Sequence, residues 1–314
     1  MLYSAFLKHG YDVQEMHFGE KEYTKFTHPN GKVWFTSAIS ISYPVLNAAV
    51  TMLARQKDLS SQFAASIGVS VPQTVYTSNA ESAQLLLEAT KKVIVKPVDA
   101  SASRGLTLNI ESMSELEEAI LTAQQASDKP VLVQEQVTGD ELRFVVLDGK
   151  IEAAILRQTP RVVGDGQSSI AELIKQENVS RANIKITHAT YPSLDQFITS
   201  DVQNDQTVLG VGEVLELGKG TMIRSGASIY DVTPNVHESY VDVVTHLAHE
   251  LGASFLIVDL IIADYKKPLT DTNYWFLEFN TAPALRLFYA CRDGNHFDIM
   301  PHLIKMVDSA LSQK

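Results

Sequence analysis

The chain has 314 residues, of which 45% are hydrophobic, enough for one large folded domain or two to three small ones. Its formal net charge of -11 argues against broad binding to nucleic acids or anionic membranes, while leaving room for a local basic pocket that binds phosphate. Cys291, the one cysteine, excludes an internal disulfide and fits a reducing compartment. We find no signal-peptide pattern and no apolar run approaching about 18 residues, so we expect a cytoplasmic protein without a membrane span.

The first seventy residues predict a short α/β region. Gly10 should end the first helix, and Pro29-Asn30-Gly31 is a strong turn signal within a hairpin. Gly68 should close the last helix of the region. In order, the expected elements are a helix over 2–9, a strand over 11–16, a hairpin over 22–41, and helices over 46–55 and 59–67.

From residue 80 onward, helices and strands are mixed. Ser114 and Glu117 form a capping-box pattern, and Asp148-Gly149 predicts a tight hairpin turn. Residues 178–212 are polar and weakly periodic, which predicts a loop or a small helical insertion. The expected helices cover 80–90, 114–126, 170–177, 238–251 and 296–311. The expected strands cover 93–98, 106–110, 131–136, 141–147, 150–158, 213–217, 255–263 and 274–280.

Several familiar motifs fail when their spacing is checked. Gly210-Val211-Gly212 lacks the third glycine of a dinucleotide-binding turn, and the stretch 212–219 is one residue too long for a P-loop. His246 and His249 lack the further ligand of a zinc site. No nucleophile elbow is present, and a lone cysteine is more often packed than catalytic.

The strand over 274–280 carries two polar side chains near its end. Glu278 and Asn280 stand two residues apart and therefore share one face. Asp259 interrupts the apolar strand over 255–263, where a carboxylate needs a cation or hydrogen bonds. If the two strands form a hairpin, the three oxygen-bearing side chains converge, a combination suited to Mg²⁺ that also holds phosphate.

Lys96 ends another apolar strand, just before Pro97. A lysine at this position either extends to solvent or points at an anion. With these charged residues at its strand ends, the chain resembles the ATP-grasp carboxylate–amine ligases. It is most similar to the ATP-grasp modules of cyanophycin synthetase and of the bifunctional glutathione-synthesising enzyme. The resemblance spans roughly residue 57 to the C-terminus. The stretches that carry it are Lys57-Asp58-Leu59, Gly68-Val69-Ser70-Val71-Pro72, Val93-Ile94-Val95-Lys96-Pro97, Val133-Gln134-Glu135-Gln136-Val137-Thr138-Gly139-Asp140-Glu141-Leu142-Arg143-Phe144, Pro160-Arg161-Val162-Val163-Gly164-Asp165-Gly166, Tyr230-Asp231-Val232-Thr233 and Glu278-Phe279-Asn280-Thr281-Ala282-Pro283.

The resemblance implies a role for each matching position. Lys57 and Lys96 would hold the α- and β-phosphates of ATP, and Asp259, Glu278 and Asn280 would bind one or two Mg²⁺ ions, with Mn²⁺ as a possible substitute. The mobile phosphate loop would contribute Ser101, Ser103 and Gly105. The segment that meets adenine would contribute Gln134, Glu135 and Val137, and Glu141 would accept hydrogen bonds from the ribose hydroxyls. The arginines implied to clamp the substrate carboxylate and the acyl-phosphate are Arg143, Arg157, Arg224 and Arg286.

The fold class implied is α+β or α/β, with two ATP-grasp lobes that grip ATP. The expected division is a short N-terminal region over 1–70, a small lobe over 71–140 and a large lobe with the metal site over 141–314. The implied reaction activates the carboxylate of an amino acid or small peptide as an acyl-phosphate and couples it to an amine. We expect small-molecule partners, no nucleic acid and no membrane, and the resemblance leaves a homodimer open.

Two departures limit the resemblance. The phosphate loop over 99–105 has a single glycine, and the stretch 220–226 replaces a segment richer in asparagine and glycine. Neither the Glu–Cys ligase module nor the Mur-ligase-like module of the similar proteins is present, so the substrates cannot be transferred. The alternative function is a nucleotide-binding regulatory or partner subunit that keeps the fold without ligase turnover.

Overall fold

The structure, a computed structural model, describes residues 1–37, 41–98, 105–127, 129–184, 190–282, 285–293 and 297–312. Its helices are α1 (Leu2–Lys8), α2 (Ala48–Ala54), α3 (Lys57–Ser66), α4 (Gln84–Thr90), α5 (Met113–Gln124), α6 (Ile170–Asn183), α7 (Ser200–Gln203), α8 (Glu238–Glu250) and α9 (Ile299–Ser312). Its strands are β1 (Asp12–Phe18), β2 (Lys21–Thr27), β3 (Val33–Ser37), β4 (Thr74–Thr77), β5 (Val93–Pro97), β6 (Thr107–Ile110), β7 (Val131–Glu135), β8 (Asp140–Leu147), β9 (Lys150–Gln158), β10 (Arg161–Val163), β11 (Val214–Glu216), β12 (Ser228–Asp231), β13 (Phe255–Ile262) and β14 (Tyr274–Asn280).

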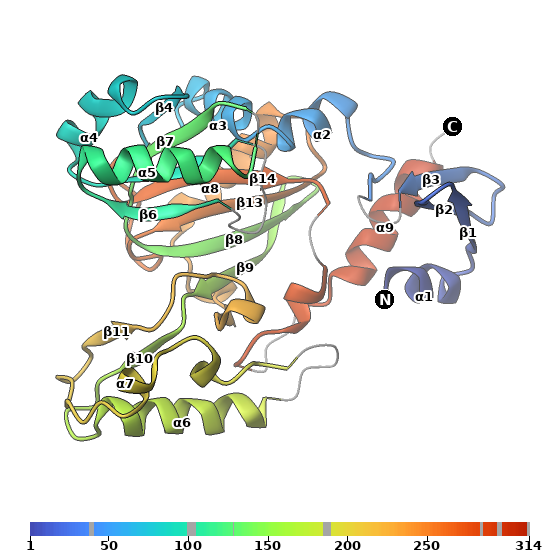
Figure 1. Cartoon of the computed structure of the whole chain (residues 1–314). Coiled ribbons are helices and arrows are strands. Elements are labelled where there is room, and N and C mark those ends of the chain that lie inside the picture. The colour runs from blue at the N-terminus through green and yellow to red at the C-terminus, as the bar shows by residue number, and fades with distance from the viewer. Residues whose placement is uncertain are drawn as a thin grey trace.

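A five-stranded antiparallel sheet is the centre of the molecule (Figure 1). Its strand order is β12-β9-β8-β13-β14. Successive side chains of a strand point to opposite faces, so each strand contributes to two cores. On one face Leu142, Phe144 and Leu256 pack with Tyr240 and Leu247 of α8, and α2 and α3 add apolar side chains to the same core. This face is therefore closed to solvent by helices.

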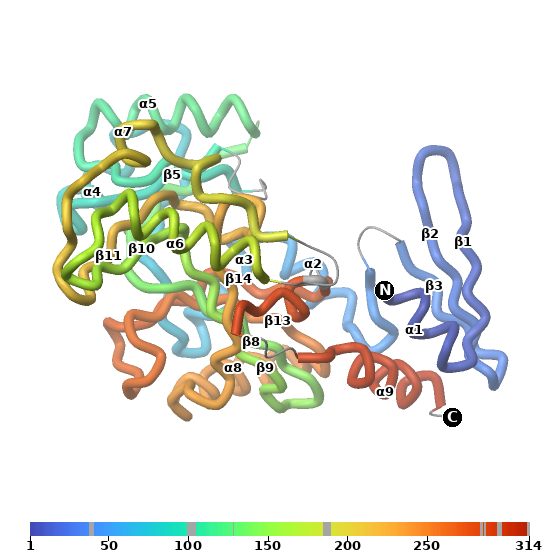
Figure 2. Tube along the Cα trace, turned by 90° about the horizontal axis from the view of Figure 1, so that it is seen from below, coloured from blue at the N-terminus to red at the C-terminus, as the bar shows by residue number. Residues whose placement is uncertain are grey.

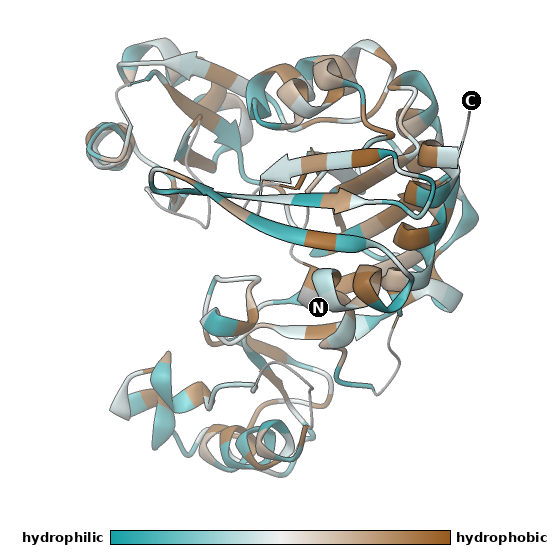
Figure 3. Ribbon diagram, turned by 90° about the vertical axis from the view of Figure 1, so that its right-hand side faces the viewer, coloured by the Kyte–Doolittle hydropathy of each residue, from teal (hydrophilic) through white to brown (hydrophobic). Residues whose placement is uncertain are grey.

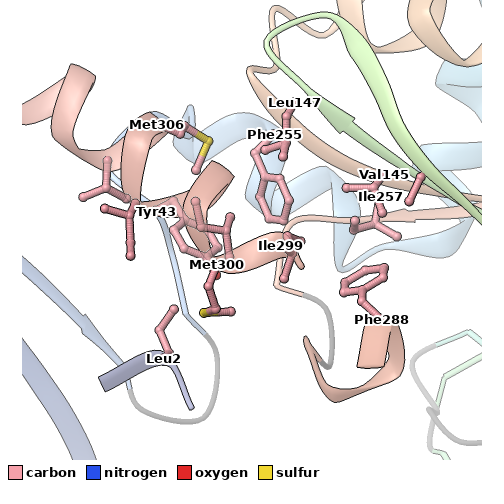
Figure 4. Packing of buried hydrophobic residues seen from close by; sticks show 14 of the residues in the cluster. Leu2, Tyr43, Val145, Leu147, Phe255, Ile257, Phe288, Ile299, Met300 and Met306 are labelled. Carbon is pink, nitrogen blue, oxygen red and sulfur yellow. The ribbon is translucent and has the colours of Figure 1, made fainter. Parts of the chain in front are cut away.

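The opposite face of the large sheet is apolar over half of its length. There Val145 and Leu147 of β8 and Phe255 and Ile257 of β13 meet residues that come from α9 and from the 3-10 helix η5 (Leu285–Tyr289), as Figure 4 shows. The contributors from α9 include Ile299, Met300 and Met306, and η5 contributes Phe288. The remaining half of this face carries the charged residues of the site.

A four-stranded antiparallel sheet, β4-β7-β5-β6, lies next to the large sheet and carries α4 and α5 on its outer side (Figure 1). Its core consists of the inward residues of β5 and β7 packed against the apolar faces of the two helices. The chain passes from this small sheet to the large one between Glu135 and Asp140, where β7 ends and β8 begins.

A third sheet, β1-β2-β3, packs with α1 against α9, and both chain ends lie in this part of the molecule (Figure 2). Aromatic contacts hold the unit together: Phe26 stacks on Trp34, and Phe6 meets both rings edge-on. The carboxylate of Asp308 in α9 accepts hydrogen bonds from Tyr11 and, at 2.8 Å, from Nε2 of His9. The first strands of the chain are thus tied to its last helix.

The predicted hairpins and most predicted elements are confirmed. Strands β13 and β14 pair antiparallel as expected, and the turn at Asp148-Gly149 joins β8 to β9, with both residues at positive φ. Each of the four sheets pairs antiparallel, so the α+β class is correct and the α/β alternative is not. The three-part division of the chain stays a prediction, although α2 and α3 pack into the core of the large sheet rather than with β1-β2-β3.

Three predictions differ from the structure. The capping box is formed by Ser112 and Glu115, because the helix begins two residues earlier than the pattern at Ser114 and Glu117 suggested. Residues 178–183 continue helix α6 instead of starting a loop. The strands β4, β10 and β12 were not predicted, since each has only three or four residues. In the described ranges, no helix is both long and apolar enough to cross a bilayer.

Gly139 allows the close passage between the two sheets. Its φ is +145°, and a Cβ at this position would lie 2.5 Å from the carbonyl oxygen of Ile262. We expect Gly139→Ala to lower the free energy of unfolding by about 2 kcal/mol or more, because both the backbone angle and the space are incompatible with alanine. Urea-induced unfolding measures this loss.

Gly149→Ala is the matched control for that substitution. Gly149 also has a positive φ, +75°, but a Cβ there meets nothing within 4 Å. The control should cost only about 1 kcal/mol, the intrinsic penalty of the left-handed region. Equal losses in the two variants would show that the contact with Ile262 has no energetic weight.

Candidate active site

A row of charged side chains crosses the large sheet on one face. The register pairs Arg143 of β8 with Asp259 of β13, and Asp259 in turn with Glu278 of β14. Directly opposed residues of neighbouring strands point to the same face, so the three side chains stand side by side. Two residues further along β14, Asn280 lies on this face as well. The predicted convergence of Asp259, Glu278 and Asn280 on neighbouring strands is thus present in the fold.

Asp259 is held by a two-pronged ion pair with Arg143. The Nε atom donates to Oδ1 at 2.8 Å and the Nη2 atom to Oδ2 at 2.6 Å. Asp259 is only 1% exposed, so this pair supplies the cation that a carboxylate inside an apolar strand requires. Burial alone would lower the pKa of Arg143, but Asp259 outweighs it and raises that pKa, so the guanidinium stays charged.

Glu278 lies between a lysine and an amide. Nζ of Lys57, the first residue of α3, is 3.3 Å from Oε2, and Nδ2 of Asn280 donates to Oε1 at 3.1 Å. Burial alone would raise the pKa of Glu278, yet Lys57, Asn280 and Arg143 together hold it below its usual range. The carboxylate is therefore ionised at neutral pH. The amide nitrogen of Asn280 is used by Glu278, which leaves the carbonyl oxygen to face elsewhere.

Lys96 brings the small sheet into the same site. Its Nζ donates to Oε1 of Gln134 at 2.9 Å, and Nε2 of Gln134 donates to Oγ1 of Thr74 at 2.8 Å. Burial, reinforced by the neighbouring charge of Lys57 and opposed by Glu278, lowers the pKa of Lys96 to about 8. Lysines from a small-sheet strand and from helix α3 thus stand close to the carboxylates of the large sheet.

Glu141 and Arg157 form a second buried ion pair on neighbouring strands, in register between β8 and β9. Nε of Arg157 also donates to the carbonyl oxygen of Thr221 at 3.0 Å. Both side chains are 10% exposed. Arg157 therefore ties the loop that contains Thr221 to the sheet, and Glu141 is engaged by an arginine.

The segment expected to meet adenine is the connection between the sheets. Gln134 directs its side chain to Lys96, and the carboxylate of Glu135 accepts a hydrogen bond from the backbone of Gln73 at 3.2 Å. Val137 is half-buried in the connection that follows β7. Gly105, at the end of the predicted phosphate loop, has a φ of +70°, and a Cβ there would lie 2.9 Å from Cγ of Pro97, so this position requires glycine.

Other predicted site residues are not brought into this group. Arg224 is exposed on the 3-10 helix η3 (Ile223–Ser225). Ser101 and Ser103 lie outside the described residues, as does the side chain of Arg286, whose backbone belongs to η5. The roles of Thr74 and Thr221 were not anticipated. For Thr74, the sequence offered one signal: Gln134 is a polar residue within the buried strand β7, and a buried amide needs hydrogen-bond partners.

Alternative chemistries find little support in the described ranges. Cys291 is buried, and burial raises the pKa of its thiol to about 12, so it stays protonated. His246 and His249 are both exposed on α8. No group of three or more His, Cys, Asp or Glu side chains that could hold a metal is found there. A metal at this face would need Asn280 as well as the carboxylates.

Comparison with known proteins agrees with this arrangement. Residues 60–202 match the ATP-grasp domain of prokaryotic glutathione synthetase. Cyanophycin synthetase from Geminocystis herdmanii is 29% identical over 222 residues, covering 68% of this chain and 25% of that protein. The glutathione biosynthesis bifunctional protein of Streptococcus thermophilus is 29% identical over 262 residues, covering 79% of this chain and 34% of that protein. The chain spans about a quarter to a third of the length of these relatives.

The arrangement of the two main sheets has a counterpart among solved structures. The crystal structure of a bifunctional glutathione synthetase from Pasteurella multocida has the same fold, with a TM-score of 0.64 and 22% identity, covering 98% of this chain and 43% of that one. The chain therefore has the ATP-grasp fold, and its sequence is similar to parts of cyanophycin synthetase and of the bifunctional glutathione biosynthesis protein.

The two acidic side chains of the row should differ sharply in their effect on stability. We expect Asp259→Ala to cost about 3–5 kcal/mol, because it leaves the buried Arg143 without its partner. Glu278→Ala should cost about 1 kcal/mol or less, because its pair with Lys57 is partly solvated. Urea-induced unfolding of both variants at pH 7 compares them. Similar losses would contradict the assignment of Arg143–Asp259 as the structural pair.

Proposed function

We propose that the chain is an ATP-dependent carboxylate–amine ligase. The observation that supports this most directly is the meeting of Lys57 and Lys96 with Glu278 at the face that also carries Asp259 and Asn280. Two lysines from different elements offer positive charge to phosphates, while the carboxylates next to them offer ligands to a divalent ion. The ATP-grasp fold and the synthetases among the relatives agree with this reading.

The donors fit Mg²⁺. Asp259, Glu278 and Asn280 present two carboxylates and an amide oxygen, which are hard ligands of the type that Mg²⁺ accepts together with phosphate oxygens. When bound, Mg²⁺ supplies charge neutralisation to the transferring phosphoryl group. Lys57 forms an ion pair with Glu278. If Glu278 binds a metal ion instead, a phosphate group can take its place as the partner of Lys57. One or two ions, or Mn²⁺ in their place, are compatible with these ligands.

The nucleotide contacts are assigned along the passage between the sheets. We place adenine against the segment from Gln134 to Val137 and the phosphates near Lys57, Lys96 and the loop that ends at Gly105. Glu141 is assigned to the ribose hydroxyls, which would then share it with Arg157. The side chain of Gln134 has a different task, because it orients the ammonium of Lys96.

The arginines divide by their partners. Arg143 and Arg157 are engaged by Asp259 and Glu141, so we assign them chiefly to holding those carboxylates. Arg224 is exposed on η3, and we assign it, together with Arg286 on η5, to the substrate carboxylate and the acyl-phosphate. A guanidinium fork matches the planar oxygens of both groups.

The proposed chemistry has two balanced steps. An oxygen of the substrate carboxylate attacks the γ-phosphorus of ATP, ADP leaves, and an acyl-phosphate forms. The nitrogen of an amine then attacks the acyl carbon, inorganic phosphate leaves, and the nitrogen loses a proton to give the amide. Both steps need positioning and charge neutralisation rather than a protein nucleophile. The substrates are an amino acid or small peptide and an amine; a homodimer is compatible with this role.

The second candidate function is a nucleotide-binding regulatory or partner subunit. The chain corresponds to only part of the length of these relatives, so a module of this size can act beside another chain. A regulator has less need of three oxygen ligands placed beside two lysines, and for this reason we prefer the ligase.

Turnover separates the two functions. We expect the chain with ATP and Mg²⁺ to release ADP and phosphate in the presence of one carboxylate and amine pair from a panel of amino acids and dipeptides. Glu278→Gln should lower kcat by about 10²-fold or more, because it removes a charged ligand at the site where phosphoryl charge develops. If the chain binds ADP but turns over no carboxylate and amine pair, the ligase function is refuted and the regulatory function is favoured.

Nucleotide affinity should fall as the pH rises above about 8. Lys96 has a lowered pKa of about 8, so below this pH the ammonium is already charged, whereas above it the protein must take up a proton to bind phosphate. We expect the affinity for ADP with Mg²⁺ to fall by up to about tenfold per pH unit between pH 8 and 9.5. Isothermal titration calorimetry measures this. Lys96→Met should abolish the dependence, while the exposed control Lys150→Met should retain it.

A further inference from the structure

Residues 159–227, described except for 185–189, form a side lobe that we call the α6 lobe (Figures 1 and 3). It contains β10, β11, α6 and α7 and has a small core of its own, formed by Val162, Ile170, Leu173, Ile174, Leu194, Leu209 and Leu217. Both chain connections of the lobe lead to neighbouring strands of the large sheet, β9 and β12. Because its core is separate, contacts outside that core must fix its orientation.

A buried polar cluster provides such contacts. Glu177 of α6 accepts from Nε of Arg181 at 2.8 Å and also pairs with both terminal nitrogens of Arg292, which lies in the segment after η5. The hydroxyl of Ser228 in β12 accepts from Arg181 at 3.0 Å and from Arg292 at 2.8 Å. Three parts of the chain, the α6 lobe, β12 and the C-terminal segment, therefore meet at one carboxylate and one hydroxyl.

Tyr191 reinforces this junction from the lobe side. Its hydroxyl donates to the carbonyl oxygen of Ala290 at 2.7 Å and accepts from the backbone N–H of Ile229 at 3.1 Å. The guanidinium groups of Arg181 and Arg292 each lie 5.7 Å from the centre of its ring. One tyrosine thus bridges β12 to the C-terminal segment and contacts both cations.

The charges make Glu177 the sensitive member of the cluster. Arg181 is 2% exposed and the side chain of Arg292 is 9% exposed, and the two cations share this single carboxylate. Neutralising Glu177 leaves two guanidinium groups close together without their common anion, which is unfavourable in a buried place. The junction can therefore be opened by a change of one carboxylate to an amide.

The junction joins the parts of the chain that carry the proposed substrate arginines. Ile229, whose carbonyl accepts from the backbone N–H of Arg292 at 2.8 Å, is the register partner of Arg157. Thr221, which Arg157 holds, and Arg224 belong to the α6 lobe, while η5 carries Arg286. The cluster consequently determines how the lobe stands relative to the C-terminal segment.

We propose that Glu177, Arg181 and Arg292 are positioning residues that hold the α6 lobe against the C-terminal segment and so set the affinity for the carboxylate substrate. This assignment to substrate affinity rests on the proposed ligase function. The proposed nucleotide contacts lie on the small sheet and the connection after it, on α3, and on β8 and β14. The side-chain hydrogen bonds of Glu177, Arg181 and Arg292 reach none of these residues. The effect should therefore be selective for the carboxylate substrate.

The test is Glu177→Gln in the full chain. We expect the KM for the carboxylate substrate to rise at least tenfold, the Kd for ADP with Mg²⁺ to stay within twofold, and kcat at saturation to stay within threefold. Hydrogen exchange should become at least tenfold faster in α6, β10 and β11 but not in β5 and β7. Asp201→Asn, an exposed carboxylate of the same lobe, is the control and should change none of these values.

A double-mutant cycle with Arg292→Gln separates a shared junction from independent effects. The KM of the double variant should rise by less than the product of the two single fold-increases, because both substitutions remove the same contact. The proposal is overturned if Glu177→Gln changes neither the KM nor the hydrogen-exchange rates. It is also overturned if the affinity for ADP falls as much as the affinity for the carboxylate substrate. If Glu177→Gln does not fold, Glu177→Asp and Arg292→Lys provide the same comparison.

Failure of the ligase function gives a different result from failure of this proposal. Absence of turnover in the unmodified chain refutes the ligase function. Hydrogen exchange then still tests whether the cluster holds the α6 lobe. Equal exchange rates in Glu177→Gln and in the unmodified chain refute the positioning role of the cluster.

Discussion

The strand register of β8, β13 and β14 is the constraint on which the site depends. It places Arg143, Asp259 and Glu278 side by side on one face of a sheet whose other face carries the apolar core under α8. Because side chains alternate along a strand, a slip of one residue would turn all three into the apolar core under α8. The cost of burying those charges makes this the register that the sequence can tolerate.

Compensation of charge explains how so polar a face coexists with a stable sheet. Asp259, Glu141 and Glu278 each have a cationic partner, and the most buried pair, Arg143–Asp259, has the best geometry. Lys96 differs, since its partner is the neutral amide of Gln134 and its pKa is lowered. The same arrangement that stabilises the unbound protein therefore leaves a surplus of positive charge where phosphates are proposed to bind.

The sequence was sufficient for the β13–β14 hairpin and for the convergence of Asp259, Glu278 and Asn280, because alternation and a buried carboxylate are local signals. It was not sufficient for the Arg143–Asp259 pair, whose members lie 116 residues apart and meet only through strand order. Short strands such as β12 carry too few residues for a periodic signal. The capping box was misplaced because Ser112–Glu115 and Ser114–Glu117 satisfy the same pattern, and only packing selects between them.

The tie between β1-β2-β3 and α9 has a consequence for synthesis of the chain. Phe6, Phe26 and Trp34 leave the ribosome early, but the helix that completes their core, Ile299–Ser312, is made about 260 residues later. At about 5–20 residues per second, this part of the nascent chain waits for roughly 13 to 50 seconds with its aromatic side chains uncovered. The unit formed by β1-β2-β3 and α1 is therefore among the last parts of this chain to fold, and it is where a chaperone would find exposed apolar surface.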